Sequence, residues 1–359
     1  MSMLTVNLGE NSYDILIGSG LLSNLGSECA GRGLSGRVAV ITNPAVAGIY
    51  SDQVRESLAV SGNQVSVIEI PDGEQYKNSA TLNRVYDELI RAGLDRTSYI
   101  VALGGGVVGD LAGFAAATYM RGIPFVQVPT TLLAQVDSSV GGKTAIDHPR
   151  GKNLIGAFYQ PRLVLIAVQT LTSLPKREFN AGLAEVVKYG VSLDQAFFEF
   201  LEQSSDKILA MERECLVYLI QRCCELKAKV VELDEKETGL RAILNYGHTL
   251  GHAMETLSGY GTLAHGEAVA IGMTLAARIS MARGHCNDQD FARISALLNR
   301  FGLPHTPPHF EQRQLMDTLL TDKKNSSGSI KFICNRGIGD HVVENLTTEQ
   351  LLTLSGLEV

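Results

Sequence analysis

Short, continuous apolar runs that alternate with helical stretches constrain this chain most strongly. In the first half the runs lie at residues 4–6, 13–17, 38–42, 65–70, 99–103, 125–128 and 163–166. The first two flank a turn at 9–11 and predict a hairpin. The later runs lack polar alternation, which is typical of strands buried on both faces. Helical patterns at 44–61 and 79–92 separate them. The order β-α-β-α predicts a parallel sheet with helices on both faces.

The character of the chain changes after residue 174. Helical patterns follow one another at 176–189, 195–203, 213–233, 249–257, 266–282 and 288–301, and strands are expected only at 329–334 and 341–343. We therefore predict two domains: an α/β, Rossmann-like parallel-sheet domain at 1–174 and a mostly α-helical domain at 175–359. Ligands usually occupy clefts between such domains.

Composition excludes several classes of protein. The 359 residues carry a net charge of −7, whereas a nucleic-acid-binding protein needs a basic face. No apolar run reaches the ~18–20 residues of a membrane span, and the first residues lack the basic and apolar regions of a signal peptide. The six cysteines form no CxxC pair, which argues against a disulfide framework. We expect a cytoplasmic protein with no nucleic-acid or membrane partner.

Two glycine clusters are candidates for phosphate binding. Gly104, Gly106 and Gly109 fit G-x-G-x-x-G between a strand and a helical pattern that opens at Leu111. Backbone N–H groups in such a loop can face a pyrophosphate. The loop follows a later strand, however, and no acidic residue comes about 20 residues on to hold a ribose. Tight packing at a turn is therefore the alternative. The second cluster, at 141–144, is not a P-loop, because Asp137 stands where the first glycine belongs and 130–140 reads as helix.

Histidines and a glutamate suggest a metal site. His248, His252 and His265 fall within 18 residues, and the first two share one face of a helix. Glu185 lies in an apolar helical context, where a carboxylate should be paired or should bind a cation. Two histidines, one glutamate and an open position would make a catalytic zinc site. Helix capping and hydrogen-bonded histidines remain the alternative.

Cations gather around these same segments although the chain is acidic. They are Arg121, Lys143, Lys152, Lys188, Lys227 and Arg241. A solvated helix face would explain Lys227, but Lys143 and Lys152 both follow glycine-rich loops. Cations near a metal and a glycine loop suggest a small polyanionic substrate.

Taken together, these motifs resemble the 3-dehydroquinate synthase family of the sugar phosphate cyclase superfamily. The resemblance covers nearly the whole chain, through residues 71–77, 104–110, 129–143, 151–153, 184–190, 244–253 and, near the end, 322–325. It implies a carbon–oxygen lyase of the shikimate pathway, which leads to the aromatic amino acids. Such an enzyme converts 3-deoxy-D-arabino-heptulosonate 7-phosphate to 3-dehydroquinate and phosphate. The expected steps are transient oxidation by NAD+, phosphate elimination, re-reduction, ring opening and intramolecular aldol closure.

The resemblance also implies roles for individual residues. One divalent metal ion, Zn2+ or Co2+, would be held by Glu185, His248 and His265. NAD+ would be contacted by Asp72, Gly73, Glu74, Gln75, Tyr76, Lys77, Gly106, Val107, Val108, Gly109, Asp110, Thr130, Thr131, Lys143, Lys152, Thr170, Leu171, Thr172 and Ser173. The substrate pocket would contain Arg121, Asp137, Lys143, Lys152, Asn153, Lys188, Lys227, Arg241, Asn245 and His252, with either Lys323 or Lys324. The first domain would then bind NAD+, the second would bind metal and substrate, and the enzyme would be a homodimer.

Three other functions remain open at this point. Iron-activated polyol dehydrogenases share the two-domain architecture but typically use Asp where Glu185 stands, and they have no need for so many cations. Other sugar phosphate cyclases differ only in their pockets. A nucleotide-binding sensor without enzymatic activity is the third, and the metal-binding triad argues against it.

Overall fold

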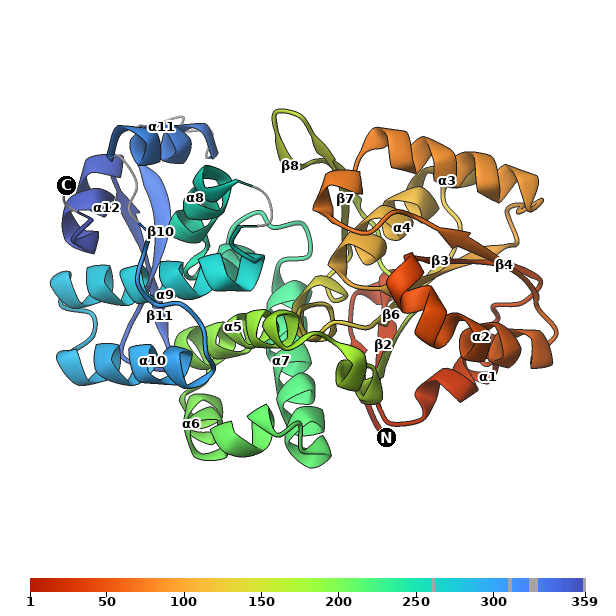
Figure 1. Cartoon of the computed structure of the whole chain (residues 1–359), viewed down its shortest axis with the longest axis horizontal. Helices are drawn as coiled ribbons and strands as arrows, with labels where there is room; N and C mark the ends of the chain where they lie inside the picture. Colours follow the sequence, from red (N-terminus) through yellow and green to blue (C-terminus); the bar gives the residue numbers. More distant parts are fainter. Residues whose placement is uncertain (260–261, 309–311, 323–328, 358–359) are drawn as a thin grey trace. The chain divides into compact units, whose positions relative to one another are not determined.

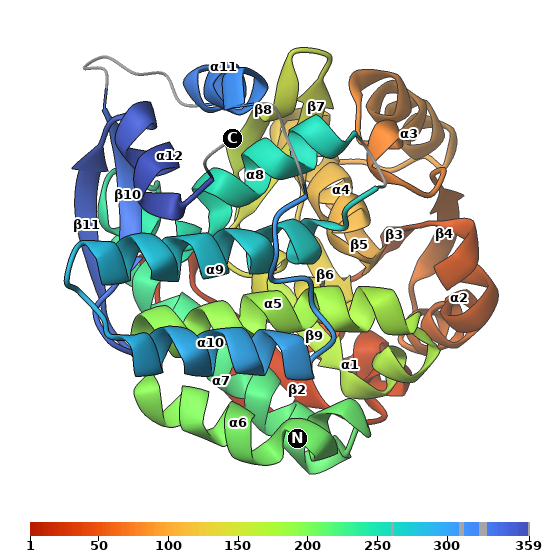
Figure 2. The ribbon, with the colours of Figure 1, turned by 60° about the vertical axis from the view of Figure 1, so that its left-hand side comes forward.

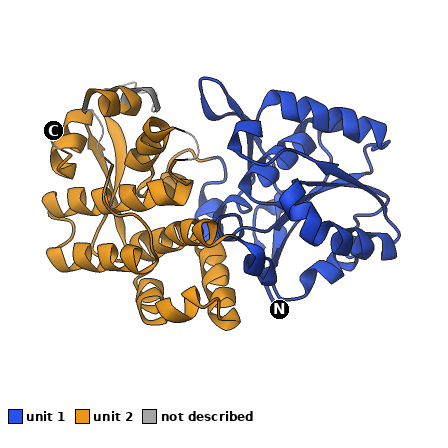
Figure 3. Cartoon of the chain, in the orientation of Figure 1, with its two compact units in different colours: residues 1–174, 227–236 blue, residues 175–226, 237–359 orange. Residues whose placement is uncertain are grey.

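The computed structural model describes residues 1–259, 262–308, 312–322 and 329–357, which divide into two compact units (Figure 1, Figure 3). Unit 1 comprises Met1–Leu174 and Lys227–Lys236, and unit 2 comprises Pro175–Leu226 and Glu237–Val359. The sequence prediction puts residues 227–236 in the second domain, whereas the structure groups them with unit 1. Their grouping has a physical basis, because Lys227 contacts Asp137 of unit 1.

A seven-stranded sheet forms the centre of unit 1, in the order β1-β2-β9-β6-β5-β3-β4. Its strands are β1 (Ser2–Val6), β2 (Tyr13–Gly18), β3 (Arg37–Thr42), β4 (Gln64–Glu69), β5 (Tyr99–Gly104), β6 (Phe125–Pro129) and β9 (Leu163–Ala167). β1 is antiparallel to β2 in the predicted hairpin, and the other pairs in the sheet are parallel.

Helices cover both faces of this sheet. They are α1 (Leu25–Ala30), α2 (Pro44–Val60), α3 (Ser79–Arg91) and α4 (Gly106–Thr118). Alternate side chains of β3 enter different cores: Val38 and Val40 pack with α1 and α2, whereas Ala39 and Ile41 pack with α3 and α4. Burial on both faces explains why the strand is apolar at successive positions. The predicted Rossmann-like fold class is confirmed.

Local structure differs from the prediction around the two glycine clusters. α4 begins at Gly106, five residues before the expected start at Leu111, because its first turn is built from glycines that give no helical pattern. The helix expected at 130–140 contains a short π-helical turn, η5 (Ala134–Ser138). The antiparallel pair β7 (Lys143–His148) and β8 (Gly151–Phe158) was not predicted. Most of β8 is exposed or half-buried, so its sequence carries no apolar alternation.

Unit 2 is mostly helical, as predicted. Its elements are α5 (Lys176–Leu193), α6 (Gln195–Leu209), α7 (Arg213–Leu233, whose end belongs to unit 1), α8 (His248–Ser258), α9 (His265–Ala282), α10 (Asp288–Arg300), α11 (Gln312–Asp322), α12 (Thr348–Ser355) and the hairpin β10 (Ile330–Asn335) and β11 (His341–Leu346). α9 is buried along most of its length and packs against α5, α8 and α10 (Figure 2). The sequence analysis missed α11 and α12.

Close packing of α8 on α9 depends on glycine. A Cβ atom at Gly272 would lie 1.9 Å from the carbonyl oxygen of Gly247, the residue that precedes α8. The start of α8 can therefore approach α9 closely, and this contact holds His248 near His265. Among the described residues, no helix combines the length and the apolar character that a membrane span requires.

Candidate active site

Three helices of unit 2 bring the predicted metal ligands together. Glu185 comes from α5, His248 begins α8 and His265 begins α9. Oε1 of Glu185 lies 3.3 Å from Nε2 of His248 and 3.6 Å from Nε2 of His265. Donor atoms of His248, His252 and His265 all lie within 4.8 Å of one another. One carboxylate and two imidazole nitrogens thus converge, as in a three-ligand catalytic zinc site.

The environment of Glu185 fits a metal ligand. Its side chain is 1 % exposed, yet neither carboxylate oxygen accepts a hydrogen bond of normal geometry. Lys188, one turn along α5 and equally buried, forms an ion pair with Oε2. Burial favours the neutral carboxyl group, but Lys188 and then His248 outweigh it and hold the pKa of Glu185 well below its usual range. The carboxylate is therefore charged and available to a cation.

The two histidines that face Glu185 are oriented through their second ring nitrogens. Nδ1 of His248 lies 3.1 Å from the carbonyl oxygen of Tyr246, and Nδ1 of His265 lies 3.1 Å from Oε2 of Glu255. Burial lowers the pKa of His265, but the neighbouring carboxylates of Glu185 and Glu255 outweigh burial and raise this pKa to about 9. Glu255 was missed by the sequence analysis. The signal was present, since Glu255 is the seventh residue after His248 on the same helical face.

The remaining predicted residues of unit 2 lie on the neighbouring elements. His252 joins the cluster through its ring, whose centroid lies 5.2 Å from that of His248 and 5.6 Å from that of His265. Arg241 and Asn245 lie on the 3-10 helix η7 (Leu240–Asn245), and the large side chain of Arg241 is only 1 % exposed. Lys323 and Lys324 lie outside the described residues.

In unit 1 the glycine motif spans the end of β5 and the start of α4. A Cβ atom added to Gly104 would lie 2.6 Å from the side chain of Val108. One added to Gly109 would lie 2.8 Å from the side-chain oxygen of Gln127. Internal packing, the alternative weighed above, therefore explains these two glycines. Gly106 begins a 13-residue helix whose first N–H groups are suited to an anion. The motif combines a packing role with a candidate phosphate site.

The predicted segment 72–77 is tied to α4 by a buried lysine. Lys77, which is 3 % exposed, binds Oδ2 of Asp110 at 2.7 Å and lies 3.6 Å from Glu74. Burial disfavours the charged lysine, but Asp110 and Glu74 outweigh it and raise its pKa. Lys152 approaches the same Glu74 at 4.0 Å. The structure thus brings four predicted residues together in one charged network.

Other residues predicted to contact NAD+ lie on the turns that follow the central strands. Thr130 donates its backbone N–H to the carbonyl of Gly104, and Thr131 accepts from the N–H of Ala134. The hydroxyl of Thr170 accepts from Gln135 at 3.0 Å, and Ser173 bonds to Tyr50 at 2.7 Å. Val108 and Leu171 are buried in the core, so only their backbone could contact a nucleotide.

The predicted substrate residues of unit 1 are only partly assembled. Nζ of Lys227 contacts the backbone oxygen of Asp137 at 2.6 Å and its Oδ2 at 3.0 Å. Asn153 adopts a positive φ of 55° and donates its N–H to Asp147, a residue that the sequence analysis missed. Lys143 begins β7. Arg121 is exposed and adopts a positive φ of 70°.

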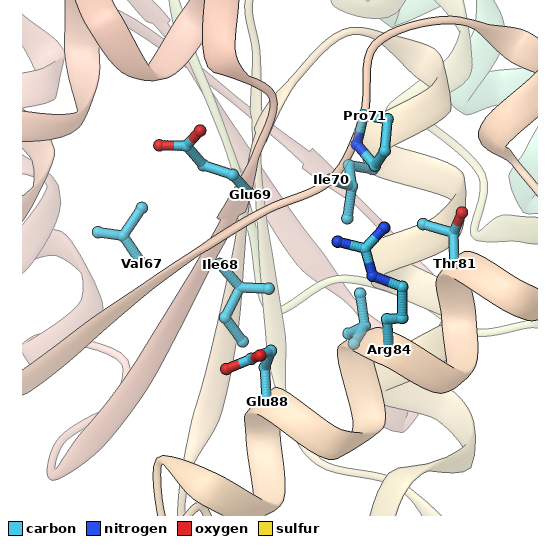
Figure 4. Close-up of a pocket in the computed structure, with 9 residues that line it drawn as sticks. Val67, Ile68, Glu69, Ile70, Pro71, Thr81, Arg84 and Glu88 are labelled. Atoms are coloured by element: carbon cyan, nitrogen blue, oxygen red, sulfur yellow. The ribbon is translucent and has the colours of Figure 1, made fainter.

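Two further features of unit 1 were not anticipated. Asn43 follows β3, caps α2 and donates to Asp72 at 2.7 Å, which links it to the segment 72–77. Its place after a parallel strand was the available signal. A cavity of about 150 Å³ lies between β4 and α3, where Arg84 and Glu88 extend toward the strand (Figure 4). Pro71 lines this cavity, but none of the residues predicted to bind NAD+, metal or substrate does.

Comparison with known proteins agrees with this arrangement. The 3-dehydroquinate synthase N-terminal model matches residues 67–181, and the C-terminal model matches residues 182–325. A 3-dehydroquinate synthase from Pelobacter propionicus is 76 % identical over 359 residues, which is all of both chains. The solved 2-epi-5-epi-valiolone synthase ValA from Streptomyces hygroscopicus, with NAD+ and Zn2+ bound, superposes with a TM-score of 0.89 at 28 % identity, covering 98 % of this chain and 99 % of that one. A 2-deoxy-scyllo-inosose synthase complexed with carbaglucose-6-phosphate, NAD+ and Co2+ gives 0.87 at 27 % identity and 99 % coverage of both chains.

The fold and its glutamate–histidine cluster define a sugar phosphate cyclase. The full-length identity to a 3-dehydroquinate synthase and the matches to both family models identify the family within this class. The chain belongs to the 3-dehydroquinate synthase family. The family, fold class and lyase activity predicted from the sequence are confirmed, whereas the roles of individual residues stay predictions.

Proposed function

We propose that this chain converts 3-deoxy-D-arabino-heptulosonate 7-phosphate to 3-dehydroquinate and phosphate, with NAD+ and one divalent metal ion, Zn2+ or Co2+, as cofactors. The observation that carries the proposal is one buried carboxylate, Glu185, which faces Nε2 of both His248 and His265. The solved cyclases bind NAD+ with Zn2+ or Co2+, and this chain presents a donor set suited to either ion.

When bound, NAD+ would accept a hydride from a ring carbinol and later return it, and the divalent ion would supply a Lewis acid for substrate hydroxyl groups. The residues of the chain would hold the metal ion, orient the substrate and transfer protons to it. Glu185, His248 and His265 would hold the metal, with Lys188 fixing the second oxygen of Glu185. His252 remains within the cluster, where a neutral imidazole could relay a proton.

Anion recognition is assigned to the predicted cations. Arg and Lys side chains form charge-assisted hydrogen bonds with the carboxylate and phosphate of such a substrate. We assign this role to Arg121, Lys143, Lys152, Lys188, Lys227 and Arg241. NAD+ is assigned to unit 1, where the start of α4, the segment 72–77 and the turns after the central strands supply backbone N–H groups and hydroxyls. The metal ion is assigned to the glutamate–histidine cluster of unit 2.

The decisive assay contains much less NAD+ than substrate. The hydride that NAD+ accepts in the oxidation is returned in the re-reduction, so NAD+ is regenerated in each cycle and a trace of it should support many turnovers. We expect phosphate release to continue without a net rise in absorbance at 340 nm. Stoichiometric accumulation of NADH would instead indicate the polyol dehydrogenase activity. A hexose 6-phosphate in a parallel assay distinguishes other cyclases, and release of phosphate from it alone would contradict the proposal.

We also propose a cytoplasmic homodimer. All six cysteines, each within the described residues, are thiols outside any disulfide, which suits a reducing compartment. Small enzymes that form closed assemblies are most often twofold dimers. Sedimentation velocity of the purified chain should give a species of twice the 38.7 kDa chain mass, and a monomer at all concentrations would contradict the dimer.

A further inference from the structure

The two histidines assigned to the metal have different partners behind them. Nδ1 of His248 faces the backbone carbonyl of Tyr246 at 3.1 Å, which is a neutral acceptor. Nδ1 of His265 faces Oε2 of Glu255, also at 3.1 Å, which is a carboxylate. The hydrogen bond that the far nitrogen of an imidazole makes decides which nitrogen is left for a metal. In both arrangements an acceptor oxygen faces Nδ1, so Nε2, which lies toward Glu185, would be the nitrogen available to a metal ion.

The position of His265 makes a carboxylate partner necessary. His265 is the first residue of the 18-residue helix α9, whose N-terminal end carries partial positive charge. That end opposes a bound dication. Glu267, two residues on, is engaged elsewhere, since its carboxylate binds the N–H of Ala264 and the guanidinium of Arg177. Glu255 is the carboxylate that reaches Nδ1 of His265, on the side of the ring away from Glu185.

Lys188 adds positive charge to the predicted metal site and so further favours a second carboxylate there. This buried ammonium group pairs with Oε2 of Glu185, so the one carboxylate in the predicted ligand set is shared with a cation. A dication held by Glu185 and two neutral histidines beside Lys188 leaves two excess positive charges among these five groups. Glu255, whose side chain is 11 % exposed, would remove one of them at a distance of a single imidazole ring.

We propose that Glu255 is a positioning residue of the metal site: its carboxylate accepts the Nδ1 proton of His265, fixes the ring, and strengthens Nε2 as a metal ligand. The inference rests on the proposed metal-dependent function, and it names a determinant of metal affinity outside the ligand set. The acceptor that faces Nδ1 of His248 belongs to the backbone, so a side-chain substitution cannot remove it.

The test compares Glu255→Gln and Glu255→Ala with the unchanged chain, using Zn2+ and Co2+ titrated against a competing chelator. We expect the dissociation constant to rise about 10- to 100-fold in Glu255→Ala, the usual effect of losing such a partner, and by less in Glu255→Gln, which keeps an acceptor oxygen. The d–d absorption of bound Co2+ should also shift in both variants, because the orientation of a ligand changes.

Glu344→Gln is the matched control. Glu344 also binds a histidine of unit 2, with Oε1 2.6 Å from Nε2 of His285, but that histidine is not a predicted ligand. The metal affinity of Glu344→Gln should stay within twofold of that of the unsubstituted protein. Metal affinity and Co2+ spectrum unchanged in a folded Glu255→Gln would overturn the inference while leaving the proposed function intact. An unchanged chain that binds neither metal would overturn the proposed function as well. Circular dichroism of the metal-free variants separates misfolding from altered binding, and Glu255→Gln carries the test if Glu255→Ala does not fold.

Discussion

At the scale of single side chains, His248, His252 and His265 are alike in type but differ in what faces them. Helical spacing alone makes His248 and His252 equivalent. The carboxylate of Glu185, however, lies against His248 and His265, while His252 meets the cluster through the other two rings. If all four groups bound the metal, a tetrahedral shell would be complete and closed to substrate. One histidine must therefore stay off the metal for the proposed chemistry.

This difference predicts opposite behaviour of two variants. His265→Ala should lose tightly bound zinc, because one of three ligands is gone. His252→Ala should keep its zinc and lose mainly turnover. Metal content of both purified proteins by mass spectrometry, beside phosphate-release rates, provides the measurement. A metal-free His252→Ala together with a zinc-loaded His265→Ala would reverse our assignment.

Lys152 offers a second prediction for a single residue. Its side chain is one-third exposed and lies 4.0 Å from Glu74, so it is held near the charged network and still accessible. Lys152→Ala should weaken binding of the phosphorylated substrate by about 1.5–3 kcal/mol, the scale of a hydrogen bond to a charged group. The exposed Lys229 on α7 serves as the control. Equal substrate affinity and turnover in Lys152→Ala and Lys229→Ala would mark Lys152 as a surface residue.

At the scale of elements, the contact of α8 with α9 depends on one position. An alanine at Gly272 would place its Cβ 1.9 Å from a backbone oxygen, which cannot move aside as a flexible side chain could. Gly272→Ala should destabilise the protein by about 1–3 kcal/mol or more, as overpacking does. Gly48 in α2 has open space around its Cβ position, so Gly48→Ala should be neutral or stabilising by up to about 1 kcal/mol. Urea unfolding of both variants measures this difference, and equal midpoints would contradict it.

The end of α9 is tied to β11 by charge, which gives a pH-dependent prediction. His285 and then Arg283 bind Glu344 and lower its pKa from the ordinary 4.5. A carboxylate with a lowered folded-state pKa stabilises the fold above its unfolded pKa, and this contribution is lost as the pH falls through the folded value. Glu344→Gln should therefore cost about 0.5–1 kcal/mol at pH 7, because the partners are partly exposed, and progressively less as the pH falls from 4.5 through the lowered pKa of Glu344. The exposed Glu56 on α2 is the control, and a gap between the two variants that does not depend on pH would refute this origin.

The same elements show how far the sequence predicts the structure. Strands such as β3 and β5 are predictable because burial on both faces leaves an unbroken apolar run. The start of α4 is not predictable in this way, since Gly106 and Gly109 are poor helix formers and Gly109 is packed against Gln127. β8 was missed because exposure removes its apolar pattern, and β7 was missed because its buried part is only the three residues 144–146. In the site, the histidines and Glu185 stand out by type and context, whereas Glu255, Asn43 and Asp147 become visible only through contacts between distant segments.

At the scale of the whole molecule, the two units should respond to different ligands. Zinc is assigned to α5, α8 and α9 of unit 2, and NAD+ to β5, α4 and the segment 72–77 of unit 1. A ligand that binds the folded state stabilises the structure it contacts. Hydrogen exchange should therefore slow in peptides of unit 2 when zinc alone is added and in peptides of unit 1 when NAD+ alone is added. Protection of the same peptides by either ligand would contradict the assignment.

The path of α7 has a consequence for how such a gene can be cut or recombined. The helix begins in unit 2 and ends in unit 1, so the chain passes from one unit to the other at three places. A fragment that encodes only residues 1–174 would leave Asp137 without Lys227, its buried cation. A crossover at residue 174 between two diverged cyclase genes would likewise combine an aspartate from one parent with a lysine from the other. An excised first unit would therefore have to include residues 227–236 as well as 1–174 to keep this ion pair.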